Sequence, residues 1–428
     1  MCRFKHNCAE KTSATARRRH AARRLLVLQP PPALPGPGAT GMSAVSALGR
    51  DPAARLRAAR WATRMQFLAL GFTAGVWGAH IPSVKEHYGL NEGTLSIALL
   101  AVAVGAVMCL AWAGSLVSRF GARLVVLVAG LVLCASLASV LLGSTLVGLL
   151  PLMWVFGGAT GLFDVSINAE GTVLEEQSGK KVMSNFHGMF SLGGMSGAGV
   201  GALLIATDVP PAWQLAGVAT VLAAIVAGAS TFMLPVHPTH PEHRSGYRLP
   251  HGTLALLGLL AAIGMLAEGA MYDWSVLYMQ TQTAAPPALA ALGYASFSGA
   301  MAATRFAGDA LRARVSAPRL LAASGMLAAV AMAAALLIRN PMVALIGFAL
   351  VGIGLANVVP MLFIGSTKVP GVAPAAAIAT VSSVGYLGFV AGPPLVGSIA
   401  HSISLSWALG VVVIGSLLLA WGARRLPA

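Results

Sequence analysis

The chain has 428 residues, of which 57% are hydrophobic and only 10% are charged, and its mean hydropathy is +0.78. Soluble globular proteins carry about 25% charged residues, so this composition leaves too little polar surface for a water-soluble particle and excludes that class. The net charge of +15 could indicate a nucleic-acid surface, but the positions of the basic residues, given below, indicate membrane topology instead.

A basic, proline-rich extension opens the chain. Its first 41 residues hold eight Lys or Arg and one acidic residue, followed by the run Pro30 to Pro37, with no apolar helical face. This composition predicts disorder as far as residue 58. No apolar core directly follows the basic run, so we expect no signal peptide. The length that begins at Met42 suits a twelve-helix carrier better, so we expect translation to start there.

Long apolar runs follow, each near the ~20 residues that a helix needs to cross a bilayer. They are longer and more continuous than the alternating strands of a membrane β-barrel. The fold class that we predict is therefore an all-α polytopic membrane protein with about twelve transmembrane helices. In chain order we expect spans over 62–84, 94–117, 122–143, 146–169, 185–206, 211–234, 254–279, 288–308, 317–338, 342–365, 374–398 and 404–423.

The basic residues alternate with these spans. Of the 28 Lys and Arg residues, 13 precede the first span and 13 lie in alternate connections or at the C-terminus. The opposite connections hold only Lys85 and Arg339. Because basic residues concentrate in cytoplasmic loops, both termini are expected in the cytoplasm.

The second group of six spans repeats features of the first at an offset near 195 residues. Three short matches fall in helices of the same rank: Gly161–Val165 with Gly354–Val358, Leu192-Gly193 and Gly197 with Leu387-Gly388 and Gly392, and Trp77 with Trp274. An offset of six spans gives two parallel pseudo-repeats. We expect a first six-helix bundle over 59–234, a cytoplasmic linker over 235–253 and a second bundle over 254–428.

The connection between spans 2 and 3 carries a recognisable motif. It contains Gly114, Leu116, Arg119, Gly121 and Arg123, and it resembles the major facilitator superfamily signature G-x-L-x-D-R-x-G-R-[RK]. Ser118 stands where the signature has Asp. A degraded copy follows span 8, with Gly308, Asp309 and Arg312. The resemblance implies a tight turn and a charged cytoplasmic gate, weakened by the loss of the carboxylate at position 118.

Most of the chain, from about residue 60 to 425, is similar to the bacterial YbjJ-like inner-membrane branch of that superfamily. The segments that carry the likeness are 268–278, 354–360 and 385–394. This likeness implies the fold and alternating access as the mode of action, but no substrate.

Ionisable groups inside hydrocarbon are costly and usually face a cavity. Glu268 and Asp164 are our candidates for proton or substrate binding, and Asn168 shares a helix face with Asp164 because the two are four residues apart. The alternative is that these carboxylates only join helices. We expect Asp273 to serve structure or an outer gate, and Glu170 to lie at the water interface.

Weaker candidates surround them. His187 could titrate near neutral pH, and Asn357 is the repeat mate of Asp164. Trp77, Trp274 and Tyr386 could line a cavity and stack on a substrate ring, although such aromatics often only pack. Arg305, four residues before Asp309, favours a structural ion pair. The sequence Gly392-Pro393-Pro394 predicts a break or bend in span 11.

No cofactor or catalytic motif is recognisable, and we expect no metal site. The histidines of the linker could bind a metal, but prolines interrupt their spacing: His237, His240, His243 and His251. The function that we expect is secondary active transport of a small solute, coupled to protons, as uptake of a sugar-like or other polar metabolite. The alternatives are a metabolite or drug exporter working by proton antiport, and a non-transporting sensor or scaffold. We expect a monomer in the lipid bilayer of the bacterial inner membrane, with no nucleic-acid partner.

Overall fold

The computed structural model describes residues 51–180, 182–207, 209–235 and 252–424, without the side chains at 309, 310, 312, 313 and 375. Within those residues all regular structure is helical. The helices are α3 (Pro52–His87), α4 (Glu92–Phe120), α5 (Ala122–Ser139), α6 (Leu146–Ser178), α7 (Met183–Ile205), α8 (Pro211–Ser230), α9 (Thr253–Thr283), α10 (Pro287–Arg314), α11 (Ala317–Ile338), α12 (Pro341–Leu355), α13 (Val358–Ser366), α14 (Pro374–Ser402), α15 (Leu405–Ala408) and α16 (Gly410–Ala423).

The twelve predicted spans are confirmed. Eleven segments of the described chain are long and apolar enough to cross a membrane, with α12 and α13 together forming one and α15 and α16 another. Helix α10, 28 residues long, is the twelfth; it is not among those eleven segments, and it carries Arg305, Asp309, Arg312 and Arg314. All connections between the helices of each half are short.

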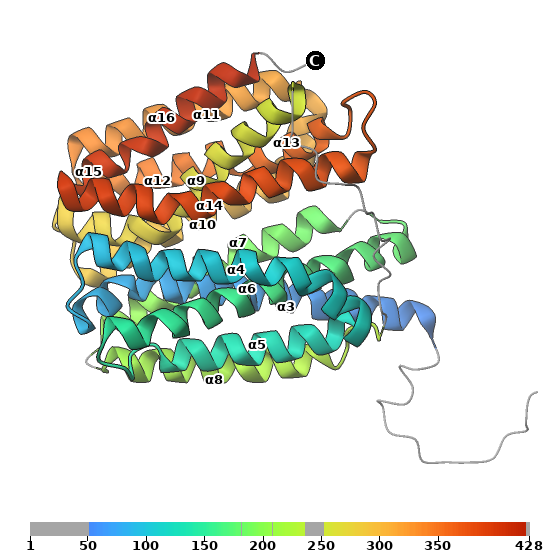
Figure 1. Ribbon diagram of the computed structural model, residues 1–428, viewed down its shortest axis with the longest axis horizontal. Coiled ribbons are helices and arrows are strands. Elements are labelled where there is room, and N and C mark those ends of the chain that lie inside the picture. The colour runs from blue at the N-terminus through green and yellow to red at the C-terminus, as the bar shows by residue number, and fades with distance from the viewer. Residues whose placement is uncertain (1–50, 181, 208, 236–251, 425–428) are drawn as a thin grey trace, which may run out of the picture. The chain divides into compact units, whose positions relative to one another are not determined.

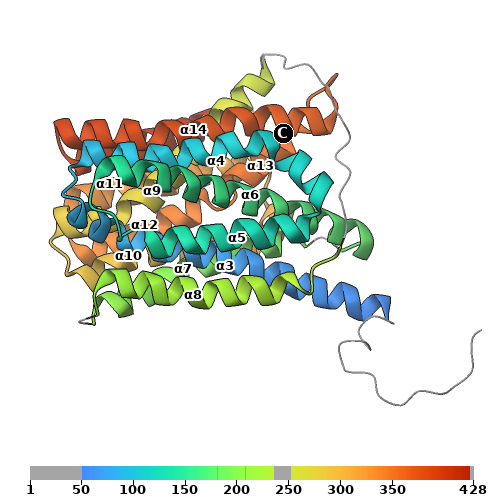
Figure 2. The same cartoon turned by 60° about the horizontal axis from the view of Figure 1, so that its bottom comes forward.

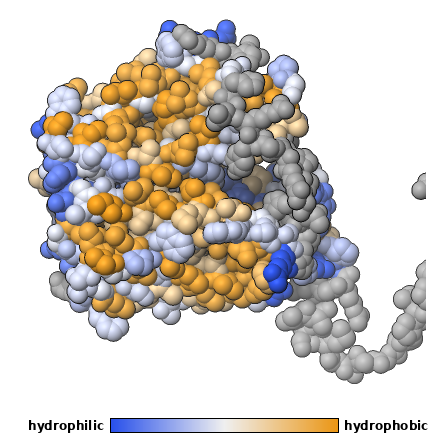
Figure 3. All heavy atoms as spheres, viewed as in Figure 1, coloured by the Kyte–Doolittle hydropathy of each residue, from blue (hydrophilic) through white to orange (hydrophobic). Residues whose placement is uncertain are grey.

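The helices form two halves that repeat each other. Figure 1 shows α3–α8 in the lower part of the view and α9–α16 in the upper part. Across the boundary, α7 packs on α10 and α4 packs on α14, a pair that also lies side by side in Figure 2. On the face in Figure 3, apolar side chains cover the middle of both halves, and hydrophilic ones gather toward the two ends. Such an apolar belt is what a bilayer requires.

One local expectation is wrong, and a second is wrong in part. Helix α3 begins at Pro52, so residues 52–58, which we assigned to the disordered extension, are helical. Helix α14 continues through Pro393 and Pro394, so the first of the two predicted alternatives, a break, is absent, while a bend stays a prediction. The interruption lies in span 10 instead, between α12 and α13. Pro360 explains its position, because this residue has no N–H to donate to the carbonyl of Ala356 and its ring clashes with that group.

Small residues bring α3 and α7 into backbone contact. A Cβ atom added to Gly193 would lie 2.2 Å from the carbonyl oxygen of Leu68, and one added to Gly71 would lie 1.9 Å from that of Phe190. Without side chains between them, two membrane helices gain close van der Waals contact. The glycine-rich face of α7 therefore packs mainly within the first half.

This contact predicts opposite effects for two alanine substitutions on α7. Gly193→Ala must push the α3 backbone away, and we expect a loss of about 1–3 kcal/mol in the free energy of unfolding. Gly199→Ala is the matched control, because a Cβ atom there meets nothing within 4 Å. Because alanine has a higher helix propensity than glycine, Gly199→Ala should leave the free energy of unfolding unchanged or raise it by up to about 1 kcal/mol. Thermal unfolding of both purified variants in detergent measures the difference. Equal stability of the two variants would contradict this packing.

Candidate functional site

A buried ion pair lies at the centre of the bundle. Glu268 is in the middle of α9, and its Oε1 atom lies 3.2 Å from Nη2 of Arg305 on α10. The two side chains are only 10% and 13% exposed. Tyr272, one helical turn after Glu268, donates its hydroxyl to the same Oε1 atom at 3.1 Å. The carboxylate is therefore held by a positive charge and a hydroxyl in a place that water hardly reaches.

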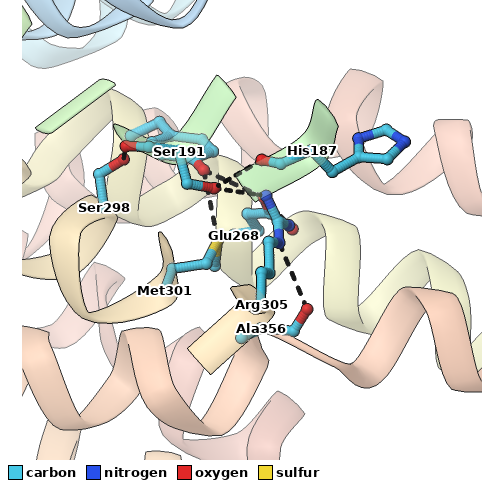
Figure 4. Close-up of polar contacts among 8 residues, drawn as sticks. His187, Ser191, Glu268, Ser298, Met301, Arg305 and Ala356 are labelled. Carbon is cyan, nitrogen blue, oxygen red and sulfur yellow. Dashed lines mark hydrogen bonds and ion pairs between the residues drawn. The ribbon is translucent and has the colours of Figure 1, made fainter. Parts of the chain in front are cut away.

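The Arg305 guanidinium joins the two halves of the protein. Its Nη1 atom donates to Oγ of Ser191 on α7 at 2.8 Å, and its Nε atom donates to the carbonyl of Ala356 at 3.4 Å. That carbonyl is free to accept because Pro360 cannot donate to it. Figure 4 shows the guanidinium between Glu268, Ser191 and Ala356. Its planar donors point in fixed directions, which suits arginine to such a three-way contact.

A further bond joins the halves beside it. Ser298 on α10 donates its hydroxyl to the backbone carbonyl of Ser191 at 2.9 Å. Gly194, one turn further along α7, makes the approach possible, because a Cβ atom there would lie 2.5 Å from Oγ of Ser298. Hydrogen bonds and close packing thus coincide where α7 crosses α10.

Asp164 and Asn168 lie together on α6, as their spacing predicts. The Asn168 amide donates to both the backbone carbonyl and Oδ1 of Asp164, at 2.9 and 3.1 Å. Both side chains are partly exposed. Tyr386 on α14, in the other half, is within electrostatic range of Asp164. Among the described residues Asp164 has no positive partner, so it keeps capacity to bind a ligand or a proton.

The other candidates are dispersed. His187 on α7 is exposed, and in Figure 4 its ring points away from Arg305. Asn357 is buried at the break between α12 and α13, close to Gly308. Asp273 on α9 is partly exposed, without an ion pair in the part of the chain that the structure describes.

The two tryptophans are packing residues by their environment. Trp274 is fully buried, and Trp77 packs against Phe156 with their ring centroids 5.4 Å apart. Neither ring offers a free face to a solute, which fits the packing alternative for these two positions.

The motif between α4 and α5 forms a tight turn. Gly121 has φ of +81°, a backbone conformation that glycine adopts readily. Gly114 is half-buried on α4, Arg119 lies over the Phe120 ring, and Arg119 and Arg123 form no ion pair with a described residue. The side chains of Asp309 and Arg312, expected in the same gate, lie outside the described residues. The charged gate therefore remains a prediction.

Sequence reasoning missed the partners of Arg305 and the burial of Glu170. The structure pairs Arg305 with Glu268, 37 residues away, a partner that we did not expect. The side chain of the partner that we expected, Asp309, lies outside the described residues, so that pair stays a prediction. Glu170, expected at the water interface, is fully buried. The free carbonyl implied by Pro360 was a usable signal that a donor would approach Ala356. Nothing in the sequence indicated that Arg305 would also donate to Ser191.

No group of three or more His, Cys, Asp or Glu residues in the described chain is placed to hold a metal ion. The four linker histidines mentioned above lie outside the described residues.

The family model of the Major Facilitator Superfamily matches residues 62–373. The chain belongs to the Major Facilitator Superfamily. An uncharacterised transporter of this superfamily from Yersinia pestis is 33% identical over 362 residues, covering 85% of this chain and 94% of that protein. The membrane protein MosC of Rhizobium meliloti is 30% identical over 364 residues, covering 84% and 88%.

Solved structures of superfamily members share the fold. A D-xylose–proton symporter has a TM-score of 0.70 at 14% identity, covering 87% of this chain and 98% of its own. The nucleoside transporter NupG has a TM-score of 0.67 at 11% identity, covering 86% and 100%. At such identities the likeness concerns the fold alone. The protein is a multi-pass membrane transporter of this superfamily, and its relatives are transporters rather than enzymes.

The central ion pair predicts a large cost for removing one partner. We expect Arg305→Met to lower the free energy of unfolding by about 3–5 kcal/mol, because Glu268 is left buried without its counter-charge. The double variant Arg305→Met/Glu268→Gln should recover part of that loss. The control is the exposed pair Lys85–Glu92, with an N···O distance of 3.4 Å and side chains 23% and 27% exposed. There Lys85→Met should cost about 1 kcal/mol or less. Thermal unfolding in detergent compares the four proteins, and similar losses at both pairs would contradict the central role.

Proposed function

We propose that this transporter takes up a small polar solute together with protons, and that Glu268 couples the two. The observation that supports this most directly is the position of Glu268. Its cation partner, Arg305, bonds at the same time to Ser191 in the other half. A change of charge at Glu268 therefore changes the interactions of Arg305, which takes part in the contact between the halves. The bacterial inner membrane, cytoplasmic termini and a monomeric state complete the proposal.

The proposed mechanism follows from electrostatics. When Glu268 accepts a proton it loses its charge, and Arg305 loses the partner that holds it in place. The hydrogen bond from Arg305 to Ser191 then weakens, and with it one link between α7 and α10. A proton can bias the equilibrium between two states only if it binds them with different affinity. Contacts to Glu268 that exist in one state and not in the other provide that difference.

The proposed solute site uses the polar side chains that keep hydrogen-bonding capacity. Asp164, Asn168 and His187 of the first half and Tyr386 of the second offer donors and acceptors, and all are at least partly exposed. This set suits a solute rich in hydroxyl or amide groups. The D-xylose–proton and fucose–proton symporters and the nucleoside transporter among the structural neighbours make these solutes the first probes.

Export by proton antiport is a second candidate on the same residues. In that case solute and proton compete for the carboxylates, so that each displaces the other. A sensor or scaffold without transport is a third candidate, which Ser118 supports because the gate motif lacks its usual carboxylate. The cross-half network around Arg305 favours a moving carrier over this third candidate.

The test uses purified full-length protein in liposomes loaded with a pH-sensitive dye. D-xylose, L-fucose and uridine are first screened by thermal shift at two pH values, since a ligand of the folded state must raise the melting temperature. The solute that binds is then added outside. For symport we expect the interior of the liposomes, whose pH the dye reports, to become acidic, and for antiport alkaline.

The Glu268→Gln variant should bind the solute and exchange it across the membrane, but move no protons. Glu92→Gln, an exposed carboxylate in the surface pair, is the matched control and should transport like the unmodified protein. Proton movement that survives in Glu268→Gln would refute Glu268 as the coupling residue. Folded protein that binds none of a broad solute library at either pH would favour the sensor.

A further inference from the structure

Glu170 forms a second buried polar site, far along the sequence from Glu268 and in the other half of the protein. It lies on α6, and its residue surface is fully buried. Its Oε1 atom accepts a hydrogen bond from the backbone N–H of Leu234 at 2.7 Å. Its Oε2 atom is also buried and has no hydrogen-bond partner among the described residues. An ionised carboxylate would be acceptor-only at both oxygens, so half of this group is unsatisfied.

Gln66 on α3 presents a second unsatisfied oxygen. Its Nε2 atom donates to the carbonyl of Val226 and to Oγ of Ser230, both at 3.0 Å and both on α8. These two bonds fix the orientation of the amide. The Oε1 atom then points elsewhere, is buried, and again has no partner in the described part of the chain.

The short segment just after α8 lies close to both of these groups. Nε2 of Gln66 lies 4.0 Å from Sδ of Met233, and Glu170 holds the backbone of the next residue, Leu234. Both side chains therefore approach the same short segment, one from α3 and one from α6.

Phe186 on α7 gives a second link, because it contacts the residues that follow Gln66 and Glu170 in the sequence. Its ring stacks on Phe67 with centroids 5.4 Å apart, and Phe67 follows Gln66 in the sequence. The same ring lies 3.2 Å from the Cβ position of Gly171, which follows Glu170. The two unsatisfied oxygens thus belong to one buried region of the first half.

Among the described residues, no counter-charge accounts for the carboxylate. Arg64 on α3 donates to Asn185, and Arg123 on α5 is exposed. Glu175, further along α6, accepts from the backbone of Val182 and Met183. None of these charged groups forms an ion pair with Glu170. A buried charge without a partner is far more costly than a neutral group that is hydrogen-bonded.

We propose that Glu170 is a second proton-binding site, in which the protonated carboxyl donates from Oε2 to Oε1 of Gln66 while its own Oε1 accepts from Leu234. One hydrogen then satisfies both buried oxygens. The site also fixes the end of the first half, because Leu234 directly precedes the linker region, 235–253. Loss of the proton leaves a buried charge and an unsatisfied amide oxygen, which loosens the packing of α3 and α6 on the end of α8.

Infrared spectroscopy tests the proposal without any transport assay. The carboxylic acid C=O stretch of the full-length protein in nanodiscs is compared with that of Glu170→Gln. Glutamine has the same shape, accepts from Leu234 and donates to Gln66, so this variant should fold and melt at the same or a higher temperature. We expect one carboxylic acid band to disappear from its spectrum. In Gln66→Leu the band should remain but move to the higher frequency of a carboxyl that lacks its acceptor. Glu92→Gln is the control and should leave the band in place.

Two results would overturn the proposal. A spectrum of Glu170→Gln without the loss of a carboxylic acid band would show that Glu170 is ionised and paired with water or a cation. A lower melting temperature or failure to fold in Glu170→Gln would show that the negative charge itself is needed. Neither result depends on whether Glu268 couples transport.

Discussion

The hydrocarbon core of a bilayer offers no hydrogen-bond partner, and this constraint determines the structure of the chain at every level. It requires helices, which satisfy their backbone internally, and it requires each interruption of a helix to be compensated by another element. Pro360 has no N–H to donate to the carbonyl of Ala356, and Arg305 from a neighbouring helix donates to it instead. Arg305 in turn needs a counter-charge, which Glu268 provides. Its Nη1 atom donates to Ser191 in the other half. A single proline in span 10 is thus connected to the contact between the halves.

The same constraint explains why the helices could be predicted from sequence. Apolar runs near ~20 residues allow few alternatives. The alternation of basic connections requires a span at α10 as well, although this helix is not among the eleven clearly apolar segments. The internal repeat added independent support, because its matches fall in helices of the same rank. The candidate site was predictable in part. Glu268 and Asp164 were selected as candidates because a carboxylate in hydrocarbon is costly and usually faces a cavity.

The partners of those residues could not be predicted, since they depend on which helix faces which. Arg305 has a carboxylate one turn away at Asp309, and this spacing gave no indication that a carboxylate of α9, Glu268, also pairs with it. Proline shows the same limit. Pro360 lies in the first turn of α13, just after a break in span 10, whereas Pro393 and Pro394 lie inside an unbroken helix. The sequence contains no measure of how well neighbouring helices stabilise a backbone that has lost a donor. Glu170 was misplaced for a related reason, because its distance from the end of a span gave no information about the end of α8 that covers it.

Glu268 and Glu170 show how environment separates two chemically equal groups. Both are buried and both accept a hydrogen bond. Among the described residues, only Glu268 has a cation within 4 Å, and that cation also contacts the other half. A charge at Glu268 is stabilised by Arg305, so removing it changes a contact between bodies that move in a carrier. A charge at Glu170 has no such partner among the described residues, and its neighbours belong to one half. In the mechanism that we propose, protonation at Glu268 acts on the relative position of the halves. The protonation that we propose at Glu170 acts on the packing within the first half, next to the linker that leads to the second.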